Sequence, residues 1–258
     1  MARRVSRRKE PSRDIHMLKE QTKVDAGIFD EKTMIFLSKF FNKGVIEKLD
    51  APIARGKESD IYIAEPGSAA KRFEYVALKF FRVETSSFFK MENYIIGDPR
   101  FSKKITGGRE KFGIVKMWCK KEFGNLELAH RAKVNAPVPI MFNGTILAMS
   151  FIGEGGEPAR RLKDAELENP EKTLKCILDQ IGRLYRVRLV HGDISEYNIL
   201  IKGGEPYIID FGQAVLTGHP NSGEFLKRDV HNILAYFRKR YGVEMDPDET
   251  LKRITGKS

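Results

Sequence analysis

The stretch HGDISEYN, residues His191–Asn198, lies between a long segment of helical periodicity and a short apolar strand, Ile199–Ile201. Within it, Asp193 can accept the proton of an attacking hydroxyl group. Asn198, five residues later, can offer an amide oxygen to a hard cation. An Asp close to an Asn is more often a turn former, so this stretch alone does not indicate catalysis. The other motifs of the chain decide between the two interpretations.

A second acidic motif, Ile209-Asp210-Phe211-Gly212, ends a predicted strand and places its Asp 12 residues after Asn198. Gly212 allows the backbone to turn sharply, so Asp210 presents its carboxylate at the strand end. Mg²⁺ that bridges triphosphate oxygens needs oxygen ligands from one side of the site. The hairpin between the two motifs offers two such residues, Asn198 and Asp210. Together the two motifs resemble the catalytic and metal loops of the protein-kinase superfamily. They predict transfer of a phosphoryl group from ATP.

A lysine inside an apolar strand is the candidate for the positive charge that phosphoryl transfer needs. Lys79 lies between apolar neighbours in the stretch ALKF. A lone strand lysine often only protects a sheet edge, but beside kinase motifs we expect Lys79 to contact the α- and β-phosphates of ATP. Its carboxylate partner is expected on the next helix, at Glu122 or, failing that, Glu127. A mobile loop predicted at residues 84–109 accounts for the 43 residues between Lys79 and Glu122.

Two further segments are candidates for contacts with the nucleotide. Gly56 and Ser59 lie between two predicted strands, where a phosphate-covering loop belongs, although the spacing fits neither a Walker A loop nor the three-glycine kinase loop. We expect close backbone approach at Gly56 and a phosphate contact from the Ser59 hydroxyl or amide. In the strand that joins the two halves of the chain, the main chain of Ser150 and Ile152 is expected to bond an adenine edge, with Met149 lining the pocket.

The periodicity along the chain predicts an α+β, two-lobed arrangement with a β-rich first half and a helical second half. With the resemblance of the two motifs to kinase loops, this implies a protein-kinase-like fold with a β-rich N-lobe, a reduced helical C-lobe and an N-terminal helical extension. The predicted parts are a basic disordered arm at 1–13, the helical extension at 14–49, the N-lobe at 50–152 and the C-lobe at 153–258. Helices are expected at about 30–42, 111–134, 169–188, 224–240 and 248–254. Asn143-Gly144, between two apolar runs, predicts a β-hairpin.

The composition sets limits on the class of protein. The chain has 46 Lys and Arg against 35 Asp and Glu, a net charge of +11, which favours association with polyanions such as nucleic acid. Its two cysteines, Cys119 and Cys176, lie far apart on predicted helices, which argues against a disulfide framework or zinc site and for a reducing, cytoplasmic location. Because no run of 18 apolar residues occurs, we expect no membrane-spanning segment.

Five motifs taken together resemble the RIO family of atypical serine/threonine kinases. They are GKES (56–59), KEFGNL (121–126), MSFIG (149–153), HGDISEYN (191–198) and IDFGQAV (209–215). The resemblance runs over about residues 50–240 and is greatest to the archaeal RIO-one subfamily, because about 50 residues before the first strand are too few for the winged-helix domain of the second subfamily. One departure is Arg55, where the RIO-one subfamily more often has Thr.

This resemblance implies a function and a set of roles. It implies ATP with Mg²⁺ or Mn²⁺, transfer to Ser or Thr of proteins, and self-phosphorylation, which we expect within residues 84–109. It also implies a role in maturing the small ribosomal subunit, whose precursor or RNA would be the partner. By the same resemblance Asp193 is the catalytic base, Asn198 and Asp210 are metal ligands, Lys79 contacts ATP, and Asp210 becomes phosphorylated during ATP hydrolysis.

Other functions remain open on the sequence alone. A small-molecule kinase of the aminoglycoside or choline type shares the HGD and DFG strings, but 48 residues after Asp210 leave little room for its helical cap. The small kinase of the tRNA-threonylcarbamoylation complex is also short and basic, yet usually lacks an extension like residues 1–50. A catalytically dead RNA-binding scaffold has no need of Lys79, Asp193 and Asn198. The short tail also leaves little room for a peptide platform, which favours an ATP-driven switch on a ribosomal precursor.

Overall fold

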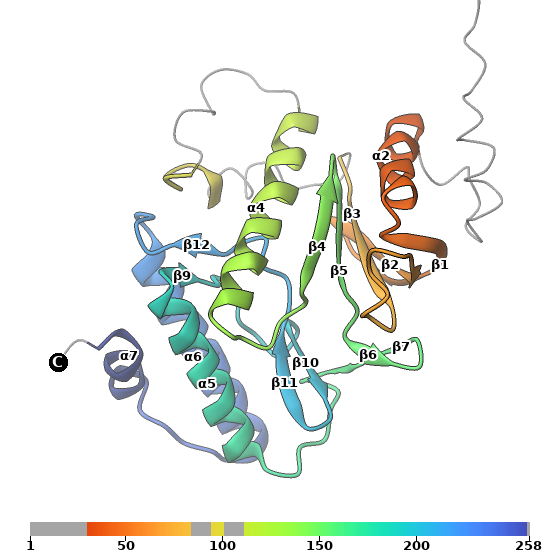
Figure 1. Cartoon of the computed structure of the whole chain (residues 1–258). Helices are drawn as coiled ribbons and strands as arrows, with labels where there is room; N and C mark the ends of the chain where they lie inside the picture. Colours follow the sequence, from red (N-terminus) through yellow and green to blue (C-terminus); the bar gives the residue numbers. More distant parts are fainter. Residues whose placement is uncertain (1–29, 84–93, 101–110, 257–258) are drawn as a thin grey trace, which may run out of the picture.

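The N-lobe is built on a five-stranded antiparallel sheet with strand order β1-β2-β3-β5-β4. The structure, a computed structural model, describes residues 30–83, 94–100 and 111–256. The strands of this sheet are β1 (Ile46–Arg55), β2 (Ser59–Pro66), β3 (Val76–Phe81), β4 (Pro139–Asn143) and β5 (Ile146–Ser150). Helix α2 (Glu31–Asn42) covers one face of the sheet and helix α4 (Lys111–Arg131) covers the other (Figure 1).

Strand β3 is buried along its whole length. Leu78 and Phe80 pack into a smaller core with α2, whereas Ala77 and Phe81 belong to a larger core with α4. Because successive side chains of a strand point to opposite faces, Lys79 lies on the same face as Ala77 and Phe81. The alternation of β3 therefore brings a lysine into the space between the sheet and α4.

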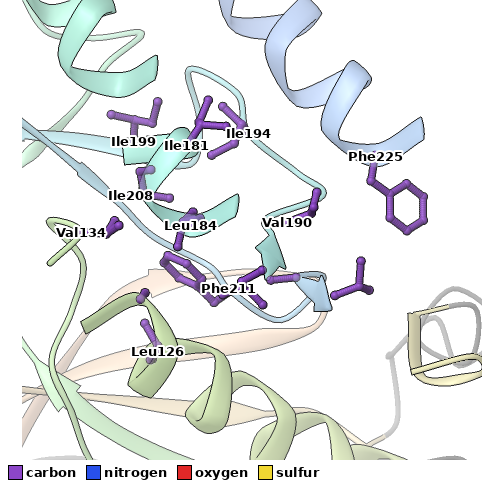
Figure 2. Packing of buried hydrophobic residues seen from close by; sticks show 14 of the residues in the cluster. Leu126, Val134, Ile181, Leu184, Val190, Ile194, Ile199, Ile208, Phe211 and Phe225 are labelled. Atoms are coloured by element: carbon purple, nitrogen blue, oxygen red, sulfur yellow. The ribbon is translucent and has the colours of Figure 1, made fainter. Parts of the chain in front are cut away.

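The C-lobe consists of three helices and short paired strands. The helices are α5 (Pro170–Arg186), α6 (Ser222–Tyr241) and α7 (Pro247–Thr255), which pack against one another. Strand β10 (Ile199–Lys202) pairs with β11 (Glu205–Ile208) and with β8 (Arg160–Arg161), while β9 (Leu189–Val190) pairs with β12 (Val215–Leu216). Figure 2 shows apolar residues of the β10–β11 hairpin and of α5 packed close to Phe211, which is fully buried.

The two lobes are joined by the chain that follows β5 and forms a small hairpin of β6 (Gly153–Glu154) and β7 (Glu157–Pro158) (Figure 1). A Cβ atom at Gly153 would lie 2.1 Å from the Glu157 carbonyl oxygen and 2.4 Å from the Phe151 ring, so only glycine fits. The larger core continues across this junction, because Leu126 of α4 belongs to the same cluster as Phe211. The lobes therefore share one apolar core beneath the connection.

The architecture confirms the two-lobed α+β prediction, with some shifts of boundary. Strand β1 starts at Ile46, inside the range assigned to the helical extension. Residues 94–100, which the sequence places within a mobile loop, are packed against both lobes. The basic arm at 1–13 and the rest of the predicted loop lie outside the described residues. Among the helices that the structure describes, none is long and apolar enough to cross a membrane.

Candidate active site

A buried ion cluster joins the two lobes around Lys79. Its ammonium group donates to both carboxylate oxygens of Glu122 on α4, at 2.8 and 2.9 Å, and to Asp210 Oδ1 at 3.0 Å. The side chains of Lys79 and Glu122 are 6% and 1% exposed, whereas that of Asp210 is 49% exposed. Glu127 is exposed, so the first of the two candidate partners is the one beside Lys79. One carboxylate is thus held inside the protein and the other is half exposed.

Charges within this cluster decide its protonation. Burial alone would lower the pKa of Lys79, but the negative charges of Asp210 and Glu122 outweigh burial and raise it. For Asp210 the sign is reversed: burial would raise its pKa, and the charge and hydrogen bond of Lys79 lower it. Lys79 is therefore positively charged and Asp210 negatively charged at neutral pH. A charged ammonium group is suited to contact phosphate, and an ionised carboxylate is suited to bind a metal ion.

The turn that carries Asp210 is held in an uncommon conformation. Asp210 has φ +65°, in the left-handed region that few residues other than glycine adopt. Gly212 lies against α4 so closely that a Cβ atom would be 2.8 Å from Trp118 Nε1. The sharp turn expected at this motif is present, but its positive φ falls on Asp210 and not on Gly212, which instead allows the close approach to α4.

The loop His191–Asn198 surrounds the second carboxylate with amide donors. Asp193 Oδ2 accepts from Asn198 Nδ2 at 2.9 Å and from Gln213 Nε2 at 3.1 Å. Burial, followed by the negative charge of Asp210, raises the pKa of Asp193 to about 6. A carboxylate with a pKa near the working pH is suited to accept and release a proton.

The backbone of this loop is held by a residue that sequence reasoning missed. Asp229 of α6 is fully buried and accepts from the N–H of Gly192 at 2.7 Å and from that of Ile194 at 2.9 Å. Burial raises the pKa of Asp229 to about 7, although the two N–H donors oppose the rise. Its sequence signal is an acidic residue on the apolar face of a predicted helix. Gln213 was also missed, although it lies within the quoted IDFGQAV motif.

Asn198 and Asp210 are brought together by backbone pairing. The Ile209 N–H donates to the Asn198 carbonyl at 3.0 Å, directly after β11 pairs with β10. Asn198 Nδ2 points to Asp193, so the amide oxygen is directed away from Asp193, and Asp210 Oδ2 lies opposite the oxygen that contacts Lys79. Mg²⁺ is commonly bound by one or two protein oxygens together with substrate phosphates, so this donor set fits Mg²⁺ on a nucleotide.

The two predicted nucleotide-contact segments lie on the sheet side of the cleft. The Gly56 N–H donates to the Ser59 carbonyl at 2.9 Å, closing the turn between β1 and β2, so this amide is bonded within the protein. In the lobe connection, the Ser150 N–H donates to the Val138 carbonyl at 2.8 Å, and the Ile152 carbonyl accepts from the Ala159 N–H at 3.1 Å. Two of the four main-chain groups expected to bond adenine are therefore engaged internally.

A cavity of about 910 Å³ opens beside Asp193. Its wall includes Gln213, Arg228, and the aromatic side chains of Tyr94, Trp118 and Phe225. The Arg228 guanidinium lies 5.0 Å from the Phe225 ring centroid and donates to the Gly192 carbonyl and to the Tyr94 hydroxyl. The cavity therefore adjoins the candidate base and is bordered by both lobes.

Comparisons with known proteins agree with this geometry. The RIO domain family matches residues 60–250. The chain belongs to the RIO family of atypical serine/threonine protein kinases. It is 39% identical to the RIO-type serine/threonine-protein kinase Rio1 of Haloferax volcanii, over 99% of this chain and 87% of that protein. It is 37% identical to the Rio1 kinase of Methanocaldococcus jannaschii, over 92% of this chain and 79% of that protein.

A solved RIO structure has the same fold. The Rio2 kinase of Chaetomium thermophilum, described as a complex with ADP, Mg²⁺ and phosphoaspartate, superposes with a TM-score of 0.66 over 88% of this chain and 67% of its own. The sequence identity is 23%, so this likeness concerns the fold. The RIO family and its archaeal Rio1 branch, both expected from the motifs, are confirmed, and the RIO assignment replaces the two small-kinase alternatives.

Proposed function

We propose that this RIO kinase transfers the γ-phosphoryl group of Mg²⁺-bound ATP to serine or threonine hydroxyl groups of proteins, with Asp193 as the catalytic base. The observation that carries the proposal is the opposite shift of the pKa of two neighbouring carboxylates. Lys79 keeps Asp210 ionised, whereas burial and the Asp210 charge raise the pKa of Asp193 to about 6. Such separation of pKa values assigns one carboxylate to a metal and the other to a proton.

The nucleotide is assigned to the cleft between the sheet and the Asp210 turn. Lys79, fixed by Glu122, would contact the α- and β-phosphates. Asn198 and Asp210 would hold Mg²⁺, which neutralises charge on the phosphates when bound. For adenine we assign the Ser150 carbonyl and the Ile152 N–H, since the other two main-chain groups are engaged.

The remaining nucleotide contacts are assigned to two nearby residues. Met149, 8% exposed beside the lobe connection, is assigned to the adenine pocket. At the β1–β2 turn we assign the Ser59 hydroxyl to phosphate, because the Gly56 amide is already bonded.

The acceptor hydroxyl is assigned to the cavity beside Asp193. Its proton would pass to Asp193 Oδ1, because Oδ2 already accepts from Asn198 and Gln213. In this position the hydroxyl oxygen would attack the γ-phosphorus from the side opposite the leaving ADP oxygen.

A second output, ATP hydrolysis through an aspartyl phosphate, is favoured by the exposure of Asp210. Its side chain is half exposed to the cleft, and only one of its oxygens contacts Lys79. The structure of the Chaetomium thermophilum relative is described with a phosphoaspartate. For this chain we propose that the Asp210 carboxylate attacks the γ-phosphorus of ATP with ADP as the leaving group, and that water then hydrolyses the aspartyl phosphate to restore Asp210 and release inorganic phosphate.

The proposed biological setting is maturation of the small ribosomal subunit. It is supported by the net charge of +11, which favours binding to an RNA-rich particle. We further propose that the kinase phosphorylates itself within residues 84–109 and that Mn²⁺ can replace Mg²⁺. Binding to small-subunit precursor RNA should depend on whether ATP or ADP is present; equal binding in both states would contradict a nucleotide-driven switch.

The activity is tested by incubating the protein with γ-labelled ATP and separating free phosphate from phosphoprotein. Phosphoserine and phosphothreonine survive acid, whereas an aspartyl phosphate is cleaved by hydroxylamine, so one experiment separates the two outputs. Lys79→Met should reduce both protein phosphorylation and phosphate release by on the order of a hundredfold, because it removes the positive charge that is assigned to contact the phosphates. Lys120→Met, which changes an exposed lysine of α4, is the matched control. Unchanged turnover in Lys79→Met would contradict the assignment.

A further inference from the structure

Residues Tyr94–Arg100, here named the bridging segment, connect the two lobes beside the cleft. Toward the C-lobe, the Tyr94 ring lies 5.1 Å from the ring of Phe225 on α6. Toward the N-lobe, the same ring lies 6.2 Å from the ring of Trp118 on α4. Asp98, in the middle of the segment, is fully buried. A segment that contacts both lobes and buries a carboxylate is a fixed part of the structure.

Arg100, the last residue of the bridging segment, is fixed by Asp98. Its Nε and Nη2 donate to the Asp98 carboxylate at distances between 2.7 and 3.3 Å, and its backbone N–H donates to Oδ1 at 3.0 Å. These bonds satisfy a carboxylate that would otherwise be costly to bury. The other terminal nitrogen, Nη1, donates to Asn125 Oδ1 on α4 at 2.8 Å. Arg100 thus links the segment to α4.

Asn125 and Lys121 hold the turn that follows Asp210. Asn125 Nδ2 donates to the carbonyl oxygens of Phe211 at 2.8 Å and Ala214 at 2.9 Å. Lys121 Nζ donates to two carbonyl oxygens of the same turn at 2.8 and 2.6 Å. The positive φ of Asp210 is a strained conformation that persists only where surrounding contacts fix it. The four bonds from α4 provide such contacts.

We propose that Arg100 and Asn125 are positioning residues that couple the bridging segment to the carboxylate of Asp210. An amide side chain has a donor end and an acceptor end. The two carbonyl oxygens of the turn require the donor end of Asn125, and the Arg100 N–H requires the acceptor end on the opposite side. Loss of the Arg100 contact removes this donor from the Asn125 oxygen, so the amide is held less firmly against the two carbonyl oxygens and the turn loosens.

The consequence concerns metal binding, and it rests on the proposed role of Asp210 as a metal ligand. Neither Arg100 nor Asn125 belongs to the donor set assigned to the metal. Partners that orient a metal ligand nevertheless affect affinity, commonly on the order of tenfold or more. Displacement of the bridging segment should therefore weaken the binding of a divalent cation with nucleotide, without a change in any ligand.

The test measures metal binding directly, with Mn²⁺ as the probe. Electron paramagnetic resonance of free Mn²⁺ is recorded with the full chain and a saturating non-hydrolysable ATP analogue. Asn125→Ala should weaken Mn²⁺ binding by about tenfold. Arg100→Lys, which keeps a positive charge beside Asp98 but lacks the fork that reaches Asn125, should weaken it by about threefold.

A double-mutant cycle distinguishes positioning from general damage. If Arg100 acts through Asn125, the double variant should bind Mn²⁺ no more weakly than Asn125→Ala alone. Additive effects, or unchanged Mn²⁺ affinity in Arg100→Lys, would overturn the proposal. Arg253→Lys on α7 and Asn42→Ala at the end of α2 are the matched exposed controls. Thermal unfolding without metal identifies variants that fold poorly, and Arg100→Lys alone then decides.

Asp210→Ala separates this inference from the proposed function. If Asp210→Ala abolishes Mn²⁺ binding while Arg100→Lys leaves it unchanged, only the coupling is wrong. If Asp210→Ala leaves Mn²⁺ binding unchanged, the metal role of Asp210 is wrong and the coupling fails with it.

Discussion

The turn that carries Asp210 and the loop that carries Asp193 are adjacent, because the Ile209 N–H bonds the Asn198 carbonyl. They are nevertheless held by different kinds of contact. Asp210 contacts a buried ammonium group, and the turn after it is fixed by side chains from α4 in the N-lobe. Within the described residues, the hydrogen-bond donors to the Asp193 carboxylate are the amides of Asn198 and Gln213, and its loop is fixed by Asp229 from α6 in the C-lobe.

This difference shows how one fold gives two neighbouring aspartates unlike properties. A nearby positive charge lowers the pKa of Asp210, whereas burial and the charge of Asp210 raise the pKa of Asp193 to about 6. The charge on one carboxylate therefore contributes to the basicity of the other. The side chains that hold the Asp210 turn come from the N-lobe, and the side chain that holds the Asp193 loop comes from the C-lobe. The predictions below test whether the two regions have separate roles.

The largest effect is expected for Asp210→Ala. Without this carboxylate, the assigned metal site has one protein ligand, and the charge stabilisation of several kcal/mol that a metal supplies is lost. We expect turnover of Mg²⁺-ATP to fall on the order of a thousandfold. The measurement is the initial rate of ADP formation across a Mg²⁺ titration. A variant with wild-type Mg²⁺ dependence would show that Asp210 is not a metal ligand.

Asp193→Asn should affect turnover with little effect on binding. Removing a general base costs about a hundredfold or more in rate, while the charges assigned to the phosphates are unchanged. We expect kcat to fall by that factor and the Kd for ATP, measured by calorimetry, to change by less than about twofold. A parallel loss of ATP affinity would place Asp193 among the nucleotide-binding groups, with Asp210. Asp164→Asn, at an exposed position, is the control.

Asp229→Asn should loosen the catalytic loop and leave the Asp210 turn intact. An amide has one acceptor oxygen, so one of the two backbone N–H groups of Gly192 and Ile194 loses its partner, at a cost of about 1–3 kcal/mol. We expect a lower free energy of unfolding and a rate loss of about tenfold, with unchanged Mn²⁺ binding. Denaturant unfolding measures the stability, the initial rate of ADP formation measures the activity, and the Mn²⁺ titration measures metal binding.

The same variant has a pH signature. Because the folded-state pKa of Asp229 is raised to about 7, the folded protein holds a proton there that the unfolded chain releases at lower pH. The stability that this group contributes is present below about pH 4 and decreases as the pH rises to about 7. Asp229→Asn should remove that part of the pH dependence. An identical pH profile in both proteins would show that Asp229 is ionised throughout.

The sequence predicts residues whose role follows from local pattern. The alternation of β3 places Lys79 on the face toward α4, and helical spacing places Glu122, rather than the exposed Glu127, on the buried face of α4. The DFG and HGD motifs are contiguous, so they can be read without knowledge of the fold. Together with Asn198 and Ser59, which the sequence also predicts, these residues include every side chain assigned to phosphate, metal and proton transfer.

The supporting residues could not be predicted in the same way. The apolar face of α6 indicates that Asp229 is buried, but not that it bonds Gly192 and Ile194, 37 and 35 residues away. The bridging segment reads as a loop because it lacks periodicity, and its order comes from contacts with distant residues. Such contacts depend on the tertiary arrangement, and a single sequence carries no local signal for them.

The smallest effect is expected at the contact between the two regions, where Gln213 of the Asp210 turn donates to Asp193 Oδ2. Asp193 must be ionised to accept a proton, so kcat/KM for ATP should fall about tenfold per pH unit below an acid limb near pH 6. A donor favours the ionised carboxylate, so Gln213→Met should raise the pKa of Asp193 and move this limb to higher pH. The rate on the plateau should change by about threefold or less, because Asn198 still donates to Asp193. If the acid limb of the pH profile does not move, burial and the Asp210 charge alone set the pKa of Asp193. The Gln213 amide would then have no effect on that pKa.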